Sequence, residues 1–473
     1  MIVRAQPGTG TARRDADRGA RGRGTGRPAA VVGLITVSLG FFVIQLDVTI
    51  VNVALPAIQR EVGGSLAGLQ WVLDAYTLAL AALMLTEGSQ ADRIGARRVF
   101  TAGLAVFGAG SAACAAAPTL SVLIAARAAQ GLGASALVPC SLALLVHQFP
   151  DPRPRARALG VWAGGGSLGV ALGPVIGGAL VAAGSWRLIF VINVPVCALT
   201  IFLLRRYVPE SPLRTSRGGD PLGLLLGVAA LAGLTAGFIT AGQQGWLAPM
   251  PDALLAAGAG AGVAFAVAEH RQAAQMLPLR LFRSRNLSVA TGVGVLFNLC
   301  LYGTLECLSL FLQQARHEPA LTTGLLVLPM SIAVGVGAVA SGPLTARLGP
   351  KPLMLTGFIL AGAGATLLTV ATAGASLALI VAGSVLIGLC SLAMPAMTAV
   401  VVGSAGREYA GVSSAILNTA RQSGGALGFA LLGALLAASQ HGGHGMALRL
   451  PLAVTAIGYL AAIALTVTIR AER

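Results

Sequence analysis

One carboxylate stands inside a long apolar segment near the start of the chain. Asp47 lies in LDVTIVNVALP, which runs from Leu46 to Pro56. An ionised Asp near the middle of a bilayer costs roughly 2.5–3.5 kcal/mol on insertion scales, so it needs a partner, water or a proton. An acid in this position therefore predicts transport of protons or ions. The alternative is a neutral Asp47 buried against Asn52 or another helix.

Glu306 is a second acid in an apolar segment, between Leu305 and Cys307. Burial disfavours the charged form of a carboxylate, so Glu306 could load and release protons near neutral pH. It could also attract a cationic substrate. The alternatives are that Glu306 snorkels to the membrane surface or pairs with Arg421 or another helix.

Arg127 is a cation in an equally apolar segment. Arg127 and Gln130 are three residues apart and share a helix face. A guanidinium cannot stay unpaired in a membrane, so Arg127 needs a carboxylate, a carbonyl or water. Either a role in coupling or a structural pair between helices would meet this need.

These charges stand out because the chain is mostly apolar. Of its 473 residues, 56% are hydrophobic and 10% are charged, with a mean hydropathy of +0.82. A soluble domain carries about 25% charged residues. Apolar runs of about 20 residues can cross about 30 Å of hydrocarbon, where only internally hydrogen-bonded structures persist. We therefore predict an all-α integral membrane protein.

About fourteen spans are expected, of which the seventh and eighth, rich in Gly and Ala, are the least distinct. The expected spans are 31–56, 70–90, 99–117, 120–146, 157–181, 187–205, 222–242, 252–268, 287–313, 322–344, 352–372, 376–402, 411–438 and 447–469.

Basic residues fall on alternate sides of this map. With a cytoplasmic N-terminus, 26 of the 32 Lys and Arg residues lie in the two tails and the even-numbered loops. Four lie in odd-numbered loops, and two, Arg127 and Arg421, lie inside spans. This positive-inside pattern predicts a multi-pass protein with both termini cytoplasmic. Topology and anionic lipid also explain the net charge of +16, so no nucleic-acid partner is expected.

Several function classes are excluded on composition. No loop is long enough for a catalytic domain, and no Gly-Lys-Ser/Thr phosphate loop is present, so neither an enzyme nor ATP-driven transport is expected. All six cysteines fall within spans and are expected to be small buried hydrophobes. His441 and His444 alone make a poor metal site. We predict no metal and no cofactor.

The chain repeats itself at an offset of about 250 residues. GSQADRIGAR at 88–97 matches GPLTARLGPK at 342–351. This duplication predicts two six-helix halves with two helices inserted between them, a pattern of secondary transporters that bind substrate between the halves. The expected divisions are a disordered, Arg-rich cytoplasmic tail (1–30), an N-terminal half (31–206), a cytoplasmic linker with two extra transmembrane helices (207–286), and a C-terminal half with a short tail (287–473).

These motifs resemble those of the major facilitator superfamily, in its fourteen-helix drug–proton antiporter branch. The resemblance covers residues 31–470 and rests on the Asp47 stretch, on QWVLDAYTL at 70–78 and on WRLIFVINVP at 186–195. It implies the major facilitator fold and says little about substrate. It also implies that Asp74, in the second stretch, lines the cavity, although a solvated role fits its outer position equally well.

The loop after the second span resembles the superfamily's gating signature. Its residues are Gly88, Asp92, Arg93, Gly95 and Arg97. Asp92 could make charge-assisted hydrogen bonds to the neighbouring arginines, as a cytoplasmic latch that biases the inward–outward equilibrium. An ordinary solvated loop that sets topology is the alternative.

Glycines recur every fourth residue from 165 to 177, which gives a seam for close helix approach. GPVIGG at 173–178 resembles the antiporter motif of exporters, and packing alone is the alternative. The motif residues are Gly169, Gly173, Pro174, Gly177 and Gly178.

Other positions take their expected roles from the resemblance. Arg127, with Gln130 and Gly131, resembles an embedded-arginine motif linked to proton coupling. Asn52 and Arg421 belong to stretches similar to the family's, which implies conformational roles together with Gln130 and Gly131. At Glu306 the family implies an apolar residue, so the chain departs from the pattern there.

The expected function is proton-coupled export of drugs or antibiotics across the bacterial plasma (inner) membrane by alternating access. In this hypothesis Asp47 and Glu306 exchange protons for substrate, with Arg127 and Asp74 beside them. The expected partners are a small amphipathic or cationic substrate, protons and the lipid bilayer, and the chain is expected to be a monomer. The alternatives are a proton-coupled transporter of one metabolite, importer or exporter, and a non-transporting membrane sensor.

Overall fold

The computed structural model describes residues 27–210, 220–271, 279–369, 376–405, 410–440 and 448–470. Within these ranges the regular structure is helical throughout. Fourteen segments are long and apolar enough to cross a membrane, which confirms the all-α fold and the number of spans. The expected disordered tail lies outside the described residues up to residue 26.

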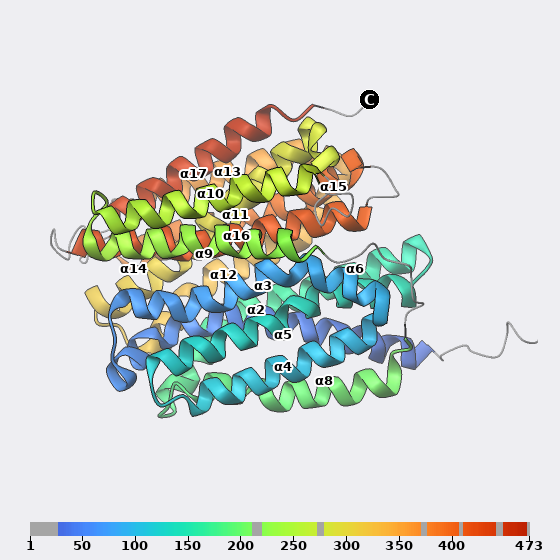
Figure 1. Ribbon diagram of the computed structural model, residues 1–473, viewed down its shortest axis with the longest axis horizontal. Helices are drawn as coiled ribbons and strands as arrows, with labels where there is room; N and C mark the ends of the chain where they lie inside the picture. The colour runs from blue at the N-terminus through green and yellow to red at the C-terminus, as the bar shows by residue number, and fades with distance from the viewer. Residues whose placement is uncertain are drawn as a thin grey trace, which may run out of the picture.

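The helices form two bundles (Figure 1). The first bundle contains α2 (Arg27–Val62), α3 (Leu66–Ile94), α4 (Ala96–Ala116), α5 (Leu120–Gln148), α6 (Pro152–Ala182), α7 (Leu188–Val191) and α8 (Asn193–Tyr207). The inserted pair is α9 (Pro221–Gln244) and α10 (Pro249–Arg271). The second bundle contains η1 (Leu279–Arg283), α11 (Arg285–Leu310), η2 (Phe311–Ala315), α12 (Ala320–Leu348), α13 (Pro350–Thr369), α14 (Leu377–Gly388), η3 (Leu389–Leu392), α15 (Ala393–Ala405), α16 (Ala410–Gln440) and α17 (Arg449–Val467).

The first described helix begins, and the last ends, at the same end of the molecule (Figure 1). We call this the proximal end and the opposite one the distal end. The inserted helix α9 packs on α10 and also contacts α3 of the first bundle and α16 of the second. The inserted pair therefore lies along the seam between the two bundles instead of standing apart from them.

The internal repeat in the sequence is a repeat in the structure. Gly95 separates α3 from α4 with φ of 104°, and Gly349 separates α12 from α13 with φ of 82°. Only glycine adopts this region without strain. The packing also repeats, because α6 lies on α2 in the first half and α16 lies on α11 in the second. The two copies of the sequence motif therefore build equivalent tight turns and helix pairs.

One expected span differs in detail. The sequence predicts a single helix over 376–402, whereas the structure has α14, the short 3-10 segment η3 and α15 in succession. Gly388, at the end of α14, lies so close to the backbone carbonyl of Met330 on α12 that a Cβ would collide with it. This close approach accompanies the change of helix type, and apolar periodicity carries no signal of it.

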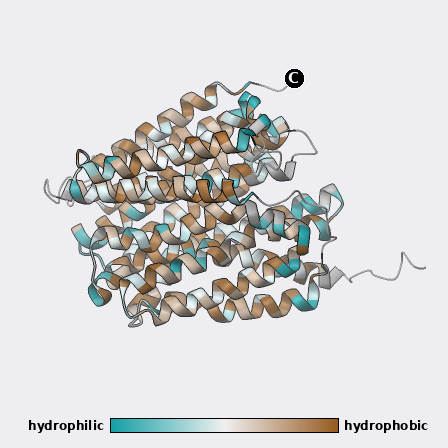
Figure 2. Ribbon diagram, in the orientation of Figure 1, coloured by the Kyte–Doolittle hydropathy of each residue, from teal (hydrophilic) through white to brown (hydrophobic). Residues whose placement is uncertain are grey.

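Polar and apolar residues are arranged as a membrane requires. Large apolar side chains cover the outside, including Leu225 at 66% exposure and Phe202 at 65%. Hydrophobic colour runs along the middle of the helices, and polar residues gather at their ends (Figure 2). The charged residues Asp47, Asp74, Arg127 and Glu306 are at most 1% exposed, so they face the interior of the bundle and not the lipid.

Candidate functional site

The site begins with an ion pair in the first half. Arg127 on α5 donates through an Nη atom to Asp47 Oδ2 on α2 at 2.5 Å, and both side chains are buried. A pair this short is charge-assisted and stronger than a neutral hydrogen bond. The sequence predicted that each residue needs a partner, and the structure brings the two together.

Asp47 accepts two further hydrogen bonds on its other oxygen. The amides of Gln130 and Asn193 each donate to Oδ1 at 2.8 Å. Gln130 also donates to Ser111 Oγ at 2.8 Å and accepts from Arg127 at 2.7 Å. Three helices, α2, α5 and α8, thus meet at one carboxylate, and α4 joins the network through Ser111. In this conformation three side-chain donors are hydrogen-bonded to the Asp47 carboxylate.

Arg127 is also fixed by the second span. Its Nε donates to the carbonyl of Val72 at 2.9 Å, and its guanidinium lies 4.3 Å from the centre of the Tyr76 ring. Cation–π contacts of this kind contribute about 2 kcal/mol when desolvated. A Cβ on Gly131 would collide with the Tyr76 carbonyl, so that glycine allows α3 and α5 to approach closely. The conformation of Arg127 therefore depends on α3 as well as on Asp47.

The glycine seam of α6 lies against the helix that carries Asp47. A Cβ on Gly169 would stand 2.5 Å from the Phe42 carbonyl, and one on Gly173 would collide with Thr49. A Cβ on Gly177 would stand 2.7 Å from the Ile50 carbonyl. The seam thus brings α6 within backbone distance of α2 from Phe42 to Ile50, on both sides of the acid.

The end of the same motif contacts the other half. A Cβ on Gly178 would stand 2.7 Å from the Ala320 carbonyl of α12, and a Cβ on Gly324 of α12 would collide with the Pro174 carbonyl. Pro174 lies inside α6. The expected antiporter motif therefore joins the Asp47 helix to the second half.

Asp74 and Glu306 have a different environment from Asp47. Both side chains are fully buried, and neither oxygen of either carboxylate has a hydrogen-bond partner. The sequence left open whether Asp74 is solvated, and the structure buries it.

Arg421 does not pair with Glu306. Its guanidinium contacts Asn418 Oδ1 at 3.5 Å and Met394 Sδ at 3.4 Å, and lies 5.3 Å from the centre of the Phe297 ring. Its Nε has no hydrogen-bond partner. The pairing of Glu306 with Arg421 that the sequence left open is therefore not the arrangement in this structure.

Asn52 lies one helical turn beyond Asp47 on α2 and outside its network. Its amide donates to the Val48 carbonyl at 3.0 Å, and its Oδ1 has no partner. The alternative in which Asp47 is buried against Asn52 is replaced by the contacts with Arg127, Gln130 and Asn193.

The expected gating loop forms its contacts with the segment after α8. Arg97 donates its backbone N–H to Glu210 Oε1 at 2.9 Å and an Nη to the Val208 carbonyl at 3.1 Å, while Arg93 is exposed. Positions 88 and 92 are helical, and the surroundings of their side chains lie outside the described part. Glu87 lies half-buried on α3, and this burial raises the pKa of its carboxyl group.

Contacts between the halves gather at the distal end. Gln313, near the distal end of α11, donates to the Val53 carbonyl at 3.2 Å. Gly433 on α16 lies against the Gln70 side chain of α3, and deeper in the seam the Gln45 amide is 3.4 Å from the Tyr302 hydroxyl. The two halves are therefore in contact at the distal end in this structure.

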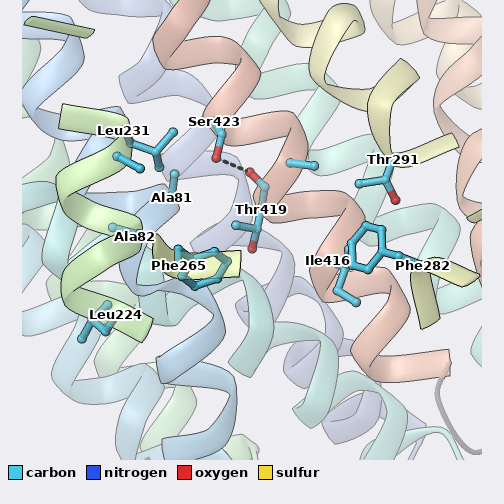
Figure 3. Close-up of a pocket in the computed structure, with 13 residues that line it drawn as sticks. Ala81, Ala82, Leu224, Leu231, Phe265, Phe282, Thr291, Ile416, Thr419 and Ser423 are labelled. Carbon is cyan, nitrogen blue, oxygen red and sulfur yellow. Dashed lines mark hydrogen bonds between the residues drawn. The ribbon is translucent and has the colours of Figure 1, made fainter. Parts of the chain in front are cut away.

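A cavity of about 240 Å³ lies nearer the proximal end, between the inserted pair and both halves. Its walls are mainly apolar, and the Thr291 and Thr419 hydroxyls beside it have no hydrogen-bond partner (Figure 3). The lining residues are Ala81, Ala82, Leu224, Gly227, Ala230, Leu231, Phe265, Phe282, Thr291, Ile416, Thr419, Ala420 and Ser423. It is suited to apolar groups with a few hydrogen-bonding atoms.

Sequence reasoning missed two members of the Asp47 network and the cavity. Asn193 stands in the WRLIFVINVP stretch, so a signal for it was present, but Ser111 has neighbours of ordinary type. The cavity combines residues from α3, α9, α10, η1, α11 and α16. No local pattern encodes a meeting of segments so far apart.

Two repeated helical halves with buried charges between apolar outer faces are the architecture of a helical membrane transporter. The model of the Major Facilitator Superfamily matches residues 37–429 and 294–473. The chain belongs to the Major Facilitator Superfamily. Since this family and its solved neighbours are transporters, the chain is a transporter and not an enzyme.

Two relatives and one solved structure illustrate the match. The chain is 37% identical over 421 residues to the methylenomycin A resistance protein of Streptomyces coelicolor, with 88% of each chain covered. It is 38% identical to the multidrug resistance protein Stp of Mycobacterium tuberculosis, with 86% of this chain and 75% of that one covered. The nucleoside transporter NupG has the same fold, with a TM-score of 0.66, 10% identity, and 93% of this chain and 100% of that one covered.

Proposed function

We propose that this protein exports drugs or antibiotics from a bacterial cytoplasm in exchange for protons. It would lie in the inner membrane as a monomer, with both termini and the proximal end cytoplasmic. The placement of basic residues supports this orientation. The resistance proteins that it resembles support export of a small, amphipathic or cationic antibiotic-like molecule.

The buried Asp47–Arg127 pair is the observation that carries this proposal. Removing one member of a buried pair leaves an uncompensated charge, which is strongly unfavourable. A proton on Asp47 would have the same effect on Arg127, which would then need other partners. Protonation of Asp47 is therefore expected to rearrange α2 against α5, and through the glycine seam to move α6.

Alternating access follows from this coupling. A shift of α2 reaches α6 at Gly169 and Gly173, and α6 meets α12 of the second half at Gly178. Packed helices shift between discrete arrangements, since their interfaces do not deform continuously. The proton on Asp47 would thus favour one relation of the two halves, and its loss would favour the other.

The proton gradient supplies enough energy for useful export. One charge moved across 100 mV contributes about 2.3 kcal/mol, and each pH unit contributes about 1.4 kcal/mol. For an uncharged substrate these together correspond to a concentration ratio of a few hundred-fold for each proton exchanged.

The cavity beside the inserted helices supports an amphipathic substrate. It is lined by apolar side chains from both halves and by the two unpartnered hydroxyls. We place the apolar part of the substrate here during access from the cytoplasmic side. The buried acids deeper in the seam would then favour a cationic group on the same molecule.

Transport in everted membrane vesicles tests the proposal. A panel of lipophilic cations and antibiotics would be added after the vesicles are energised, and dissipation of the proton gradient would be followed with a quenched dye. We expect at least one compound to dissipate the gradient with the wild type, and Asp47→Asn to lower this rate at least tenfold. Asp252→Asn, which changes an exposed acid of α10, is the matched control.

Proton release without Asp47, or a broad panel on which a correctly inserted protein moves no protons, would contradict the proposal. Glu306→Gln in the same assay separates two roles of that acid. A lower proton yield for every compound indicates proton binding, whereas a changed order of preference among compounds indicates substrate recognition.

A further inference from the structure

A cluster of side chains at the distal surface connects three segments of the first half. Glu61, at the end of α2, accepts a hydrogen bond from the Trp186 indole at 2.8 Å and forms an ion pair with Arg187. Arg187 also donates to the Ala117 carbonyl, just after α4, at 3.2 Å, and its guanidinium lies 4.4 Å from the centre of the Trp186 ring. We call Glu61, Trp186 and Arg187 the distal cluster. It joins the ends of α2 and α4 to the turn that leads into α8.

The same three helices meet again at the buried Asp47. Asn193, the first residue of α8, donates to Asp47 of α2 at 2.8 Å and to Ser111 Oγ of α4 at 3.4 Å. Asp47 and Glu61 are 14 residues apart on α2. This spacing is about 21 Å and nearly four turns, so both acids lie close to one face of that helix. The helices α2, α4 and α8 are therefore held together at two levels, one at the surface and one inside.

One connection between the two levels runs through the backbone. The Val191 N–H donates to the Arg187 carbonyl at 3.2 Å. The Ile192 N–H donates to the Leu188 carbonyl at 3.1 Å, and Asn193 follows directly as the start of α8. Arg187 and Asn193 thus belong to one short helical segment and are about 9 Å apart along its axis. A shift of the Arg187 backbone is therefore passed on to the Asn193 amide.

A second connection runs through two buried aromatic rings. The ring centres of Trp186 and Phe190 are 6.1 Å apart and their planes stand at 90°, which is a favourable edge-to-face contact. The Phe190 ring centre in turn lies 5.8 Å from the Arg127 guanidinium. The distal cluster therefore reaches the guanidinium of the buried ion pair through these rings, and its carboxylate through Asn193.

Exposure indicates that the distal cluster serves position more than stability. The side chains of Glu61 and Arg187 are 51% and 31% exposed, and ion pairs screened by solvent contribute little to stability. Pro56 lies in α2 between Asp47 and Glu61, and a proline inside a helix removes a backbone hydrogen bond. The last turns of α2 are therefore held less firmly by their own helix, and the distal cluster fixes them against the turn before α8.

We propose that the distal cluster is a set of positioning residues, which hold the Asn193 amide and the Phe190 ring against the buried ion pair. This inference rests on the proposed function and deepens it, because it assigns residues outside the pair to the coupling step. The cavity lies nearer the proximal end. Loss of the distal cluster should therefore lower the rate of the transport cycle and leave substrate binding unchanged.

A double-mutant cycle on the purified full-length protein in lipid nanodiscs tests the positioning without any transport. The melting temperatures of Glu61→Ala, Asn193→Leu and their combination are compared with that of the wild type. Glu61 and Asn193 have different hydrogen-bond partners, and the effects of residues in separate contacts normally add. Here we expect Glu61→Ala to lower the melting temperature at least about twice as much in the wild type as in Asn193→Leu, where no amide is left to position.

Asp252→Asn is the matched control, because it changes an exposed acid at the start of α10, which is also distal. It should have the same small effect in the wild type and in Asn193→Leu. Glu61→Gln keeps one oxygen for the Trp186 indole and should lower the melting temperature less than Glu61→Ala. It replaces Glu61→Ala in both experiments if that variant does not fold.

Transport in everted vesicles gives the second readout. For any compound that the wild type exports, Glu61→Ala should lower the maximal rate about tenfold, as a small misplacement of a reacting group does. The half-saturating concentration should stay within about twofold of the wild-type value, which corresponds to less than 0.5 kcal/mol of binding free energy. A variant that is only less stable would lose active protein, so its rate is normalised to the folded protein in the vesicles.

Equal losses of melting temperature in the two backgrounds would overturn the proposal, and so would a wild-type maximal rate in folded Glu61→Ala. If the effects do not add while the wild type transports no compound, the positioning of the ion pair stands and the proposed export fails. If the wild type exports drugs in exchange for protons and the effects add, the proposed function stands and the positioning fails.

Discussion

Each half has one arginine inside the membrane-spanning part, buried at Arg127 and half-buried at Arg421, and the two have different surroundings. Arg127 in the first half is bound by Asp47, a backbone carbonyl and Gln130. Arg421 in the second half contacts an amide oxygen, a thioether sulfur and a ring face, and no carboxylate in the described part. The acid of the second half, Glu306, is buried, and neither of its carboxylate oxygens has a hydrogen-bond partner.

The two halves therefore differ in what their charged residues can do, although they are built from the same repeated fold. The first half has a satisfied network, which holds four of its helices in one arrangement. The second half keeps a cation and an acid that do not neutralise one another, so its charges are available for changes in protonation or binding. The duplicated helices give both halves the same fold, and the differences in their buried polar residues give each half its own chemical properties.

The largest loss of stability is expected from replacement of Arg127, and replacement of Arg421 is the comparison in the other half. Arg127→Leu leaves Asp47 buried without its cation, which costs about 3–5 kcal/mol of stability. Arg421→Leu removes no partner from a carboxylate and should change the stability by less than about 1 kcal/mol. Thermal unfolding in detergent measures both. Equal losses in the two variants would contradict the difference between the halves.

A neutral version of the first pair tests whether its charge or its shape matters. Asp47→Asn combined with Arg127→Gln is expected to regain at least about 2 kcal/mol relative to Arg127→Leu, since no isolated buried charge remains. Proton-coupled transport in vesicles should stay at background. Transport at the wild-type rate would show that the pair is only structural.

Close helix contacts at glycines in the two halves, Gly173 on α6 and Gly424 on α16, should give smaller changes in stability. Gly173→Ala and Gly424→Ala both introduce a Cβ that collides with the facing helix, and each should cost about 1–3 kcal/mol. Gly424→Ala should cost more, because its obstacle is the Val295 backbone and not a side chain. Gly160→Ala, where the Cβ meets open space, is the control and should stabilise the helix slightly. Denaturant or thermal unfolding measures all three.

Filling the cavity on the seam should affect substrate use and leave stability nearly unchanged. A Cβ on Gly227 has no neighbour nearer than 3.9 Å, so Gly227→Leu extends into the cavity. It is expected to raise the half-saturating concentration of a transported compound several-fold, as a lost apolar contact of about 1 kcal/mol would. Gly260→Leu on the exposed face of α10 is the control. Equal effects of both variants would exclude a role for the cavity.

The smallest effect is expected at the proximal loop. Arg97 and Glu210 are about a third and a quarter exposed, at 34% and 26%, and their side chains are 3.6 Å apart. Solvent screens such a pair, so Glu210→Gln should cost less than about 1 kcal/mol. A loss comparable to that of Arg127→Leu, measured by the same thermal unfolding, would contradict this expectation and show that the contact between α4 and the segment after α8 is essential for stability.

Much of the fold could be predicted because membrane insertion leaves few choices. Apolar runs and alternating basic loops gave the number of spans, and the repeat predicted the equivalent turns at Gly95 and Gly349. The break between α14 and α15 was beyond sequence reasoning, because close approach of another helix accompanies it. The divisions at 31–206, 207–286 and 287–473 stay predictions.

The site was predicted residue by residue and not as an arrangement. A buried Asp and a buried Arg each demand a partner, so both were identified from burial cost alone. That Asp47 and Arg127 pair with one another, while Glu306 is not bound to Arg421, depends on the relative rotation of helices. Sequence spacing fixes residues on one helix face and says nothing about which face of another helix they meet.

The inserted helix α9 has a mechanical consequence. Ile239 of α9 packs with Ala67 of α3 and Ala430 of α16, so α9 contacts both halves near their distal ends. If the halves rock as in the proposed cycle, α9 slides on one of them, whereas in the described part of the chain α6 and α12 of the opposite seam contact each other directly. The axis of rocking is then displaced toward α9, and the molecule opens like a book bound along one edge, widest on the side away from the inserted pair.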